Sequence, residues 1–211
     1  MPEHDTVKML AFDPRDHAPQ DIYKLMVGSI VPRPIAFVST MDANGIANLA
    51  PFSFFTAASA NPPVVCFCPM VRRVGSPKKD TLRNIEETGE FVVNIVSGEF
   101  AEKMNACAAE VAPEIDEFEL SGLTPLASQL VRPPRVAESR VQMECRLLQL
   151  VRVSDKPMGG TLVLGEVLRF HVREGLVEEF RIDPAGLNAI GRMAGKTYAR
   201  TTDRFDMERP L

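Results

Sequence analysis

Short apolar stretches bounded by proline, glycine or polar residues recur along the chain. Their length and their content of β-branched and aromatic residues are typical of buried strands. Two of them flank Gly159-Gly160, a pair that favours an antiparallel hairpin. Asn44-Gly45 predicts another hairpin, because both central residues of a type I′ turn take positive φ. We expect strands at 35–41, 46–50, 64–68, 91–96, 141–153 and 161–172.

Helical signals are fewer and shorter. Asp80 is placed to cap a helix over 81–88 that Gly89 would end. Further helices are expected at 21–28, 99–109 and 184–192. Residues 1–20 predict an irregular arm, and 110–140 an extended excursion over the surface, because both are rich in proline or acidic groups.

Strands joined by hairpins predict a mainly β or α+β fold, an antiparallel barrel with a few peripheral helices. The chain has 211 residues and 45% hydrophobic content, enough for one core. No glycine- and serine-rich linker separates two halves, so residues 21–211 are expected to form a single domain.

Charge and cysteine content exclude several functions. A net charge of -4 argues against a nucleic-acid partner, which requires clustered Lys and Arg. The four cysteines form no CxxC pair and there are only three histidines, so we expect no metal centre. No apolar run is long enough to span a membrane, and residues 1–19 lack the apolar segment of a signal peptide. We therefore expect no membrane association and a cytoplasmic location.

Common catalytic motifs are also missing from the sequence. No GxSxG or HExxH is present, and no GxGxxG follows a predicted strand. Gly195-Lys196-Thr197 resembles the end of a P-loop, but Ile190 stands where the leading glycine is required.

Two segments carry candidate chemistry. Residues 48–56 combine three phenylalanines with small polar residues and one proline, which suits a flat apolar slot with backbone amides beside it. Residues 76–81 place Ser76, Lys79 and Thr81 at a predicted helix start, where a phosphate is favoured, although an Asp80 cap would compete for the same amides. Taken singly, residues 48–56 are more typical of a core strand with a loop, and residues 76–81 of an ordinary capped helix.

Taken together, several motifs resemble the flavin reductase-like, FMN-binding split-barrel family, in its flavoredoxin-related branch. The matching segments are 29–40, 48–55, 79–85 with 90–94, 117–118 with 121–125, 133–139 and 191–200. They occur in the family's order and extend from about Tyr23 to Pro210. The resemblance implies an antiparallel split β-barrel that binds FMN.

The resemblance also implies site residues. Contacts to the flavin and ribityl chain fall on Ser39, Thr40, Asn48, Ala50 and Pro51, ring contacts on Ser53, Phe54, Phe55 and Thr56, and phosphate contacts on Ser76, Lys79 and Thr81. Thr56 replaces a frequent Asn, Ala194 and Lys196 replace the more usual Gly and Ser, and Cys66-Phe67-Cys68 is atypical. These departures bear on the ring environment more than on flavin binding.

The activity expected from the resemblance is flavin reduction by NADH or NADPH, with hydride passing from nicotinamide C4 to flavin N5. Such a transfer depends on stacking and alignment, so no catalytic side chain is assigned. Two alternatives stay open: an electron carrier like flavoredoxin, reduced by a redox-protein donor, and a flavin-binding protein without turnover. Family members are usually homodimers with the flavin near the subunit boundary, and segments 110–140 and 191–200 are expected to close over it.

Overall fold

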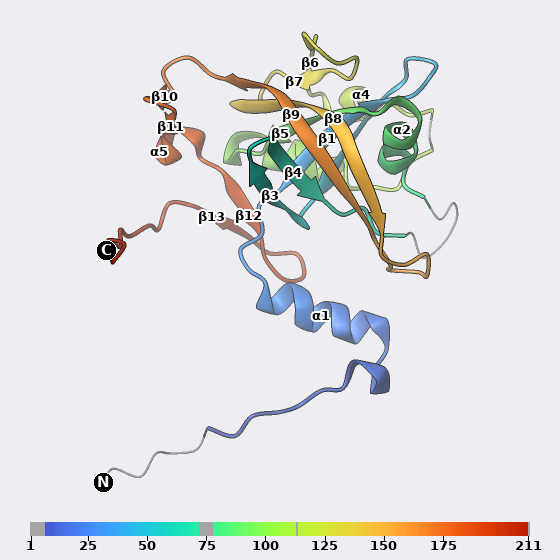
Figure 1. Cartoon of the computed structure of the whole chain (residues 1–211), viewed down its shortest axis with the longest axis vertical. Helices are drawn as coiled ribbons and strands as arrows, with labels where there is room; N and C mark the ends of the chain where they lie inside the picture. Colours follow the sequence, from blue (N-terminus) through green and yellow to red (C-terminus); the bar gives the residue numbers. More distant parts are fainter. Residues whose placement is uncertain (1–6, 72–77, 113, 211) are drawn as a thin grey trace.

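The computed structural model describes residues 7–71, 78–112 and 114–210 (Figure 1). Seven antiparallel strands form its main sheet, in the order β2-β1-β5-β8-β9-β4-β3. Their bounds are β1 Ala36–Met41, β2 Ala47–Phe52, β3 Phe55–Ala60, β4 Pro63–Phe67, β5 Glu90–Ile95, β8 Val141–Arg152 and β9 Thr161–Val172. The long β8–β9 hairpin was predicted from Gly159-Gly160 and is confirmed.

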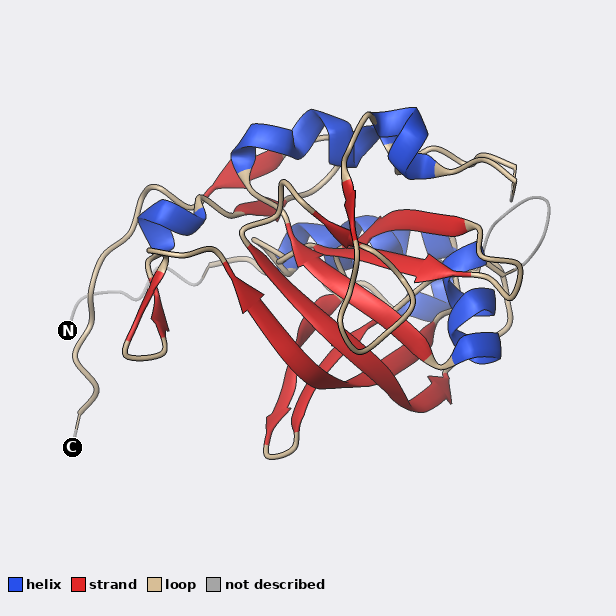
Figure 2. Cartoon of the chain, turned by 90° about the horizontal axis from the view of Figure 1, so that it is seen from above, coloured by secondary structure: helices blue, strands red, loops and turns tan. Residues whose placement is uncertain are grey.

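The sheet curls into a barrel that stays open between its two end strands (Figure 2). Strands β2 and β3 are consecutive in the chain and only Ser53 and Phe54 join them, yet they are unpaired and stand at opposite ends of the strand order. Residues near both ends nevertheless meet in one core, where the ring centroids of Phe52 on β2 and Phe67 on β4, the strand next to β3, are 5.1 Å apart. The predicted antiparallel split barrel is therefore confirmed.

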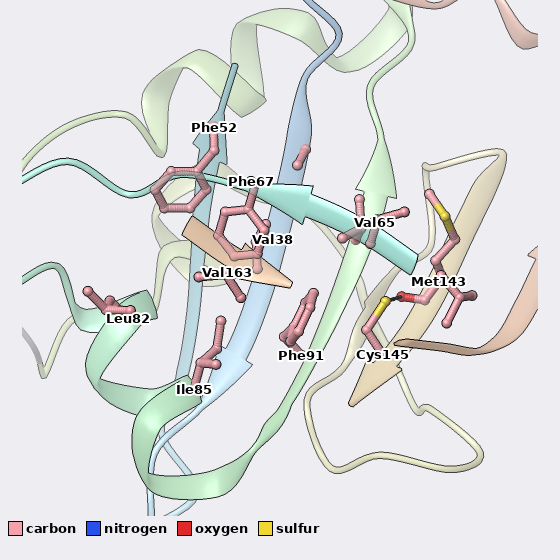
Figure 3. Close-up of a cluster of buried hydrophobic side chains, with 13 residues drawn as sticks. Val38, Phe52, Val65, Phe67, Leu82, Ile85, Phe91, Met143, Cys145 and Val163 are labelled. Carbon is pink, nitrogen blue, oxygen red and sulfur yellow. Dashed lines mark hydrogen bonds between the residues drawn. The ribbon is translucent and has the colours of Figure 1, made fainter. Parts of the chain in front are cut away.

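The barrel interior is apolar and closely packed (Figure 3). Phe67 lies between Phe52 and Phe91, with its ring centroid 5.5 Å from that of Phe91. Leu82 and Ile85, both from helix α2 (Asp80–Thr88), face these rings and cover one side of the barrel.

A second core lies on the outer face of β1 and β2. Side chains alternate along a strand, so Val38 points into the barrel and Phe37 points outward. Helices α3 (Ala101–Ala106) and α4 (Glu117–Ser121) cover this outer face and bury Met104 and Phe118 against it. The outer core explains why both faces of β1 are apolar.

The remaining elements are α1, an 11-residue helix, and several short segments. They are η1 Pro14–Asp16, α1 Pro19–Ser29, η2 Gly98–Phe100, β6 Pro125–Leu126, β7 Arg135–Val136, β10 Val177–Glu178, β11 Arg181–Ile182, α5 Pro184–Leu187, β12 Ile190–Arg192 and β13 Tyr198–Arg200. No helix in the described part of the chain is both long enough and apolar enough to cross a membrane.

Several local predictions were wrong. The helix expected over 184–192 ends at Leu187, because Asn188 takes a left-handed conformation with φ of 48° and the chain continues into β12. The helix expected over 99–109 is a 3-10 turn followed by α3, which ends at Ala106. The arm expected to be irregular over 1–20 contains η1 and the start of α1.

The first hairpin also differs from the prediction. Only Gly45 takes positive φ there, so the turn is not type I′. The Asp42 carboxylate instead accepts hydrogen bonds from the amides of Asn44 and Ile46, at 2.9 and 2.8 Å. Strand β3 was not predicted at all.

Candidate functional site

The predicted site residues that the structure describes lie on β1, β2, β3, the β2–β3 link and the start of α2. They come from β1 (Ser39, Thr40), β2 (Asn48, Ala50, Pro51), the link to β3 (Ser53, Phe54), β3 itself (Phe55, Thr56) and the start of α2 (Lys79, Thr81). Ser76, the remaining predicted phosphate contact, lies outside the described residues.

Hydrogen bonds join the two predicted segments directly. The Thr81 hydroxyl donates to Asn48 Oδ1 at 2.7 Å, so the start of α2 lies against β2. Thr40 donates to the same oxygen at 3.4 Å and accepts a hydrogen bond from Asn84 Nδ2 at 3.1 Å. We call this group, completed by Glu117 below, the Asn48 network.

The hydroxyls in this region are already used by the protein. A hydroxyl has one proton to donate, and those of Thr40 and Thr81 go to Asn48. Ser39 points to the opposite face of β1 and donates to the Pro134 carbonyl at 2.5 Å. All three side chains are buried, so in this arrangement none has a hydroxyl proton available for a ligand.

One buried acceptor in the Asn48 network has no donor. Asn84 Oδ1 has no hydrogen-bond partner within the described part of the chain, although the side chain is only 2% exposed. A buried acceptor without a donor is costly, so this edge of the site would accommodate a further donor group.

Glu117 completes the network and was not among the predicted site residues. Its carboxylate accepts hydrogen bonds from Asn48 Nδ2 at 2.8 Å and from the Leu49 amide at 3.0 Å. The side chain is 5% exposed, and burial raises its pKa, with nearby Asp80 acting in the same direction. Glu117 and Asn48 are 69 residues apart, so no local pattern could have joined them.

The apolar members of the site remain accessible. Pro51, Ser53, Phe54 and Phe55 are partly exposed and Thr56 is exposed. Behind them, the buried guanidinium of Arg33 donates to the carbonyls of Val27, Ile30 and Met193 at 2.7, 2.7 and 3.0 Å. Burial lowers the pKa of Arg33. Its Nε lies 3.4 Å from the Ser53 hydroxyl, so one side chain ties the β2–β3 link to the C-terminal region.

A cavity of about 150 Å³ opens beside this apolar surface. It is lined by Ile35, Pro51, Ser53, Met104, Asn105, Ala108, Arg192 and Tyr198. The Tyr198 hydroxyl donates to Asn105 Oδ1 at 3.0 Å, and the Arg192 guanidinium carbon lies 4.5 Å from the Tyr198 ring centroid. Segment 191–200 therefore lies next to Pro51 and Ser53.

The start of α2 lines a second, cationic cavity of about 260 Å³. Lys78, Lys79 and Arg152 contribute to its wall together with Asp155. Lys78 forms an ion pair with Glu86 at 2.5 Å, and Arg152 lies 3.5 Å from Asp155 and 3.8 Å from Glu86. Asp80 does not cap the helix as predicted, because it is the first helical residue and its carboxylate lies 2.8 Å from Arg83 Nη1. Several cations next to the first amides of a helix suit an anionic group.

These residues fit a flavin mononucleotide in kind. Pro51 and Phe54 are partly exposed apolar residues that suit a flat ring, whereas Phe55 packs against the barrel core. The cavity at the start of α2 suits one phosphate. The unpaired Asn84 oxygen accepts the kind of donor that a ribityl hydroxyl or a ring N–H provides.

Comparison with known proteins identifies relatives of this chain. Nitrilotriacetate monooxygenase component B from Bacillus cereus is 40% identical, with a TM-score of 0.89 over 95% of this chain and 99% of that one. The 2-nitrobenzoate 2-nitroreductase NbaA of Pseudomonas fluorescens is 31% identical, with a TM-score of 0.84 over 95% and 96%. An FMN-binding protein from Thermus thermophilus, 18% identical over 94% and 100% with a TM-score of 0.75, shares the fold.

The family model described as "Flavin reductase like domain" matches residues 27–194. This segment contains both cores, the Asn48 network and most of the cavity beside Pro51. The chain belongs to the flavin reductase-like domain family.

Proposed function

We propose that this protein is an FMN-binding oxidoreductase that takes hydride from NADH or NADPH. The observation that carries the proposal is that Thr81 donates a hydrogen bond to Asn48 at 2.7 Å. This bond joins the helix start that carries Lys79 to β2, the strand that leads to the partly exposed apolar residues Pro51 and Phe54. The names of two relatives above 30% identity, a monooxygenase component and a nitroreductase, support redox chemistry at this site.

The protein's own residues would bind and orient the cofactor. Pro51 and Phe54 would contact the ring, and Arg192 with Tyr198 borders Pro51 where segment 191–200 approaches. Lys79 and Arg152 would hold the phosphate. When bound, FMN supplies the N5 position that accepts hydride.

A mononucleotide suits this site better than a dinucleotide. The sequence has no GxGxxG turn to hold a pyrophosphate, and the cations gather around one cavity at the start of α2. The name of the Thermus thermophilus protein, which binds FMN on the same fold, supports this choice.

The proposal is tested by anaerobic reduction. The purified protein is loaded with FMN and titrated separately with NADH and NADPH, while flavin absorbance is followed. We expect bleaching with one or both reductants. A protein that takes up no FMN would contradict the proposal. Bound FMN that stays oxidised with both nucleotides, but is reduced by a ferredoxin-type donor, would replace it with the electron-carrier function.

A further inference from the structure

We infer that Glu117 is a positioning residue for the flavin site, and that it acts through Asn48 to hold the start of α2 in place against β2. The inference rests on the proposed function. Glu117 belongs neither to the apolar surface nor to the wall of the cationic cavity, and the inference assigns it an effect on flavin affinity.

The first step concerns the direction of the Asn48 amide. An ionised carboxylate only accepts hydrogen bonds, so Glu117 must face the NH₂ end of Asn48, at 2.8 Å. The oxygen end is then turned towards α2, where Thr81 donates to it at 2.7 Å. Glu117 therefore decides which end of the amide meets the helix, and it does so through Asn48, which bonds to both residues.

The second step concerns the free edge of β2. This strand is the end of the sheet and pairs only with β1. The Leu49 amide donates to the other Glu117 oxygen at 3.0 Å, so the carboxylate covers a backbone donor that has no strand beside it. The Glu117 side chain thus fixes both the backbone of β2 at Leu49 and the neighbouring side chain of Asn48.

The third step concerns what β2 connects. Asn48 contacts the helix start that carries Lys79 and Thr81, while Pro51 and Ser53 lie further along the same chain segment. At a strand rise of about 3.3 Å per residue, Asn48 and Ser53 are separated by roughly 17 Å. Glu117 therefore sets the position of the phosphate end relative to the ring end, and small displacements between binding groups cost affinity.

Burial makes this role specific to a carboxylate. Glu117 is 5% exposed, and both of its oxygens face N–H donors. In Glu117→Gln, one of these donors would face an NH₂ group instead of an oxygen. A charge-assisted hydrogen bond is replaced by a donor–donor contact, while the size of the side chain is unchanged.

The experiment exchanges the carboxylate of Glu117 and the amide of Asn48 between the two positions. FMN dissociation constants are measured by fluorescence quenching on apoprotein for the wild type, Glu117→Gln, Asn48→Asp and the double variant. We expect about tenfold weaker binding for each single variant, equivalent to loss of one hydrogen bond to a charged group. In Asn48→Asp, the weakening arises because two carboxylates then face each other.

The double variant, Glu117→Gln with Asn48→Asp, restores the pairing with its direction reversed. The new glutamine donates to the new aspartate, and its oxygen accepts from the Leu49 amide. The new aspartate still accepts from Thr81, and the net charge of the pair is unchanged. We expect FMN affinity within about threefold of the wild type, whereas independent effects would multiply to about a hundredfold loss.

Glu119→Gln is the matched control, since Glu119 is exposed on the same helix α4 and its replacement should leave FMN affinity unchanged. Thermal unfolding of each apoprotein shows whether the measurement was made on folded protein. Wild-type affinity in Glu117→Gln, or multiplicative losses in the double variant, would overturn the inference while leaving the proposed function intact. Absence of FMN binding by the wild type would overturn both.

Discussion

Gly165 illustrates how a single residue is fixed by barrel packing. It lies on β9, where the Phe91 ring packs directly against its backbone (Figure 3 shows Phe91 in the core). A Cβ at this position would overlap Phe91 Cζ, far inside van der Waals contact. Phe91 is fully buried and contacts Phe67, so it has no free space into which to move.

Gly165→Ala is therefore expected to lower the free energy of unfolding by about 1–3 kcal/mol or more, through overpacking. Urea denaturation followed by circular dichroism measures the difference. Gly28→Ala is the control, because a Cβ there meets no atom within 4 Å and the residue lies in helix α1. Gly28→Ala should itself stabilise helix α1 by up to about 1 kcal/mol. Equal stability of the two variants would contradict the packing argument.

At the scale of elements, a buried carboxylate organises the connection between β6 and β7. Glu144 on β8 is fully buried and accepts hydrogen bonds from the amides of Gln129, Leu130 and Val131, at 2.9, 2.6 and 3.2 Å. His171 Nε2 lies 2.5 Å from the same carboxylate. Burial opposes ionisation, but the amide and histidine hydrogen bonds outweigh it and lower the pKa of Glu144.

The lowered pKa predicts a pH-dependent contribution to stability. Because the folded-state value lies below the ordinary 4.5, ionised Glu144 stabilises the fold above that pH, and the contribution is lost as the pH falls through the folded value. Glu144→Gln should cost about 2–3 kcal/mol at pH 7 and progressively less in acid. Urea denaturation between pH 7 and pH 3 measures this. Glu166→Gln, which breaks a partly exposed ion pair with Arg146, should cost less than about 1 kcal/mol. A pH-independent difference for Glu144→Gln would contradict the assignment.

Some of the strands and contacts described above are predicted by sequence patterns, and others are not. The interior strands and the β8–β9 hairpin were predicted, because buried apolar runs and paired glycines are local signals. Strand β3 was missed, because Thr56–Ala60 are small, exposed residues without apolar alternation. Segments 48–56 and 76–81 were expected to serve one flavin site, but the use of the Thr40 and Thr81 hydroxyls within the protein was not expected. Glu117 was missed as a site residue because its role depends on a long-range contact alone.

At the scale of the whole molecule, the accessible surfaces predict a second copy of the chain. Residues Thr56–Ala60 on edge strand β3 are all exposed, and the register of β3 against β4 shifts between Ala57 and Ser59. A bulge of this kind disfavours extension of the sheet, so contact through the side-chain face is favoured over strand pairing. The N-terminal arm adds Val7, Met9 and Leu10, which are 73–82% exposed, and α1 lies outside the barrel (Figure 1). A partner chain that covered Val7, Met9 and Leu10 would remove their apolar side chains from water, which favours association.

The family resemblance implies a homodimer, and we expect it to use the β3 face, so that the partner covers Phe54. Sedimentation equilibrium should give twice the 23.3 kDa chain mass for the wild type. Ala57→Lys places a charge in the centre of that face and should shift the protein to monomer, because burying an unpaired ammonium is strongly unfavourable. Thr202→Lys adds the same charge to the exposed C-terminal segment and should remain dimeric. Since the proposed flavin surface adjoins β3, the monomeric variant should also bind FMN more weakly than the control. A monomeric wild type, or a dimer unaffected by Ala57→Lys, would show that this face is not the interface.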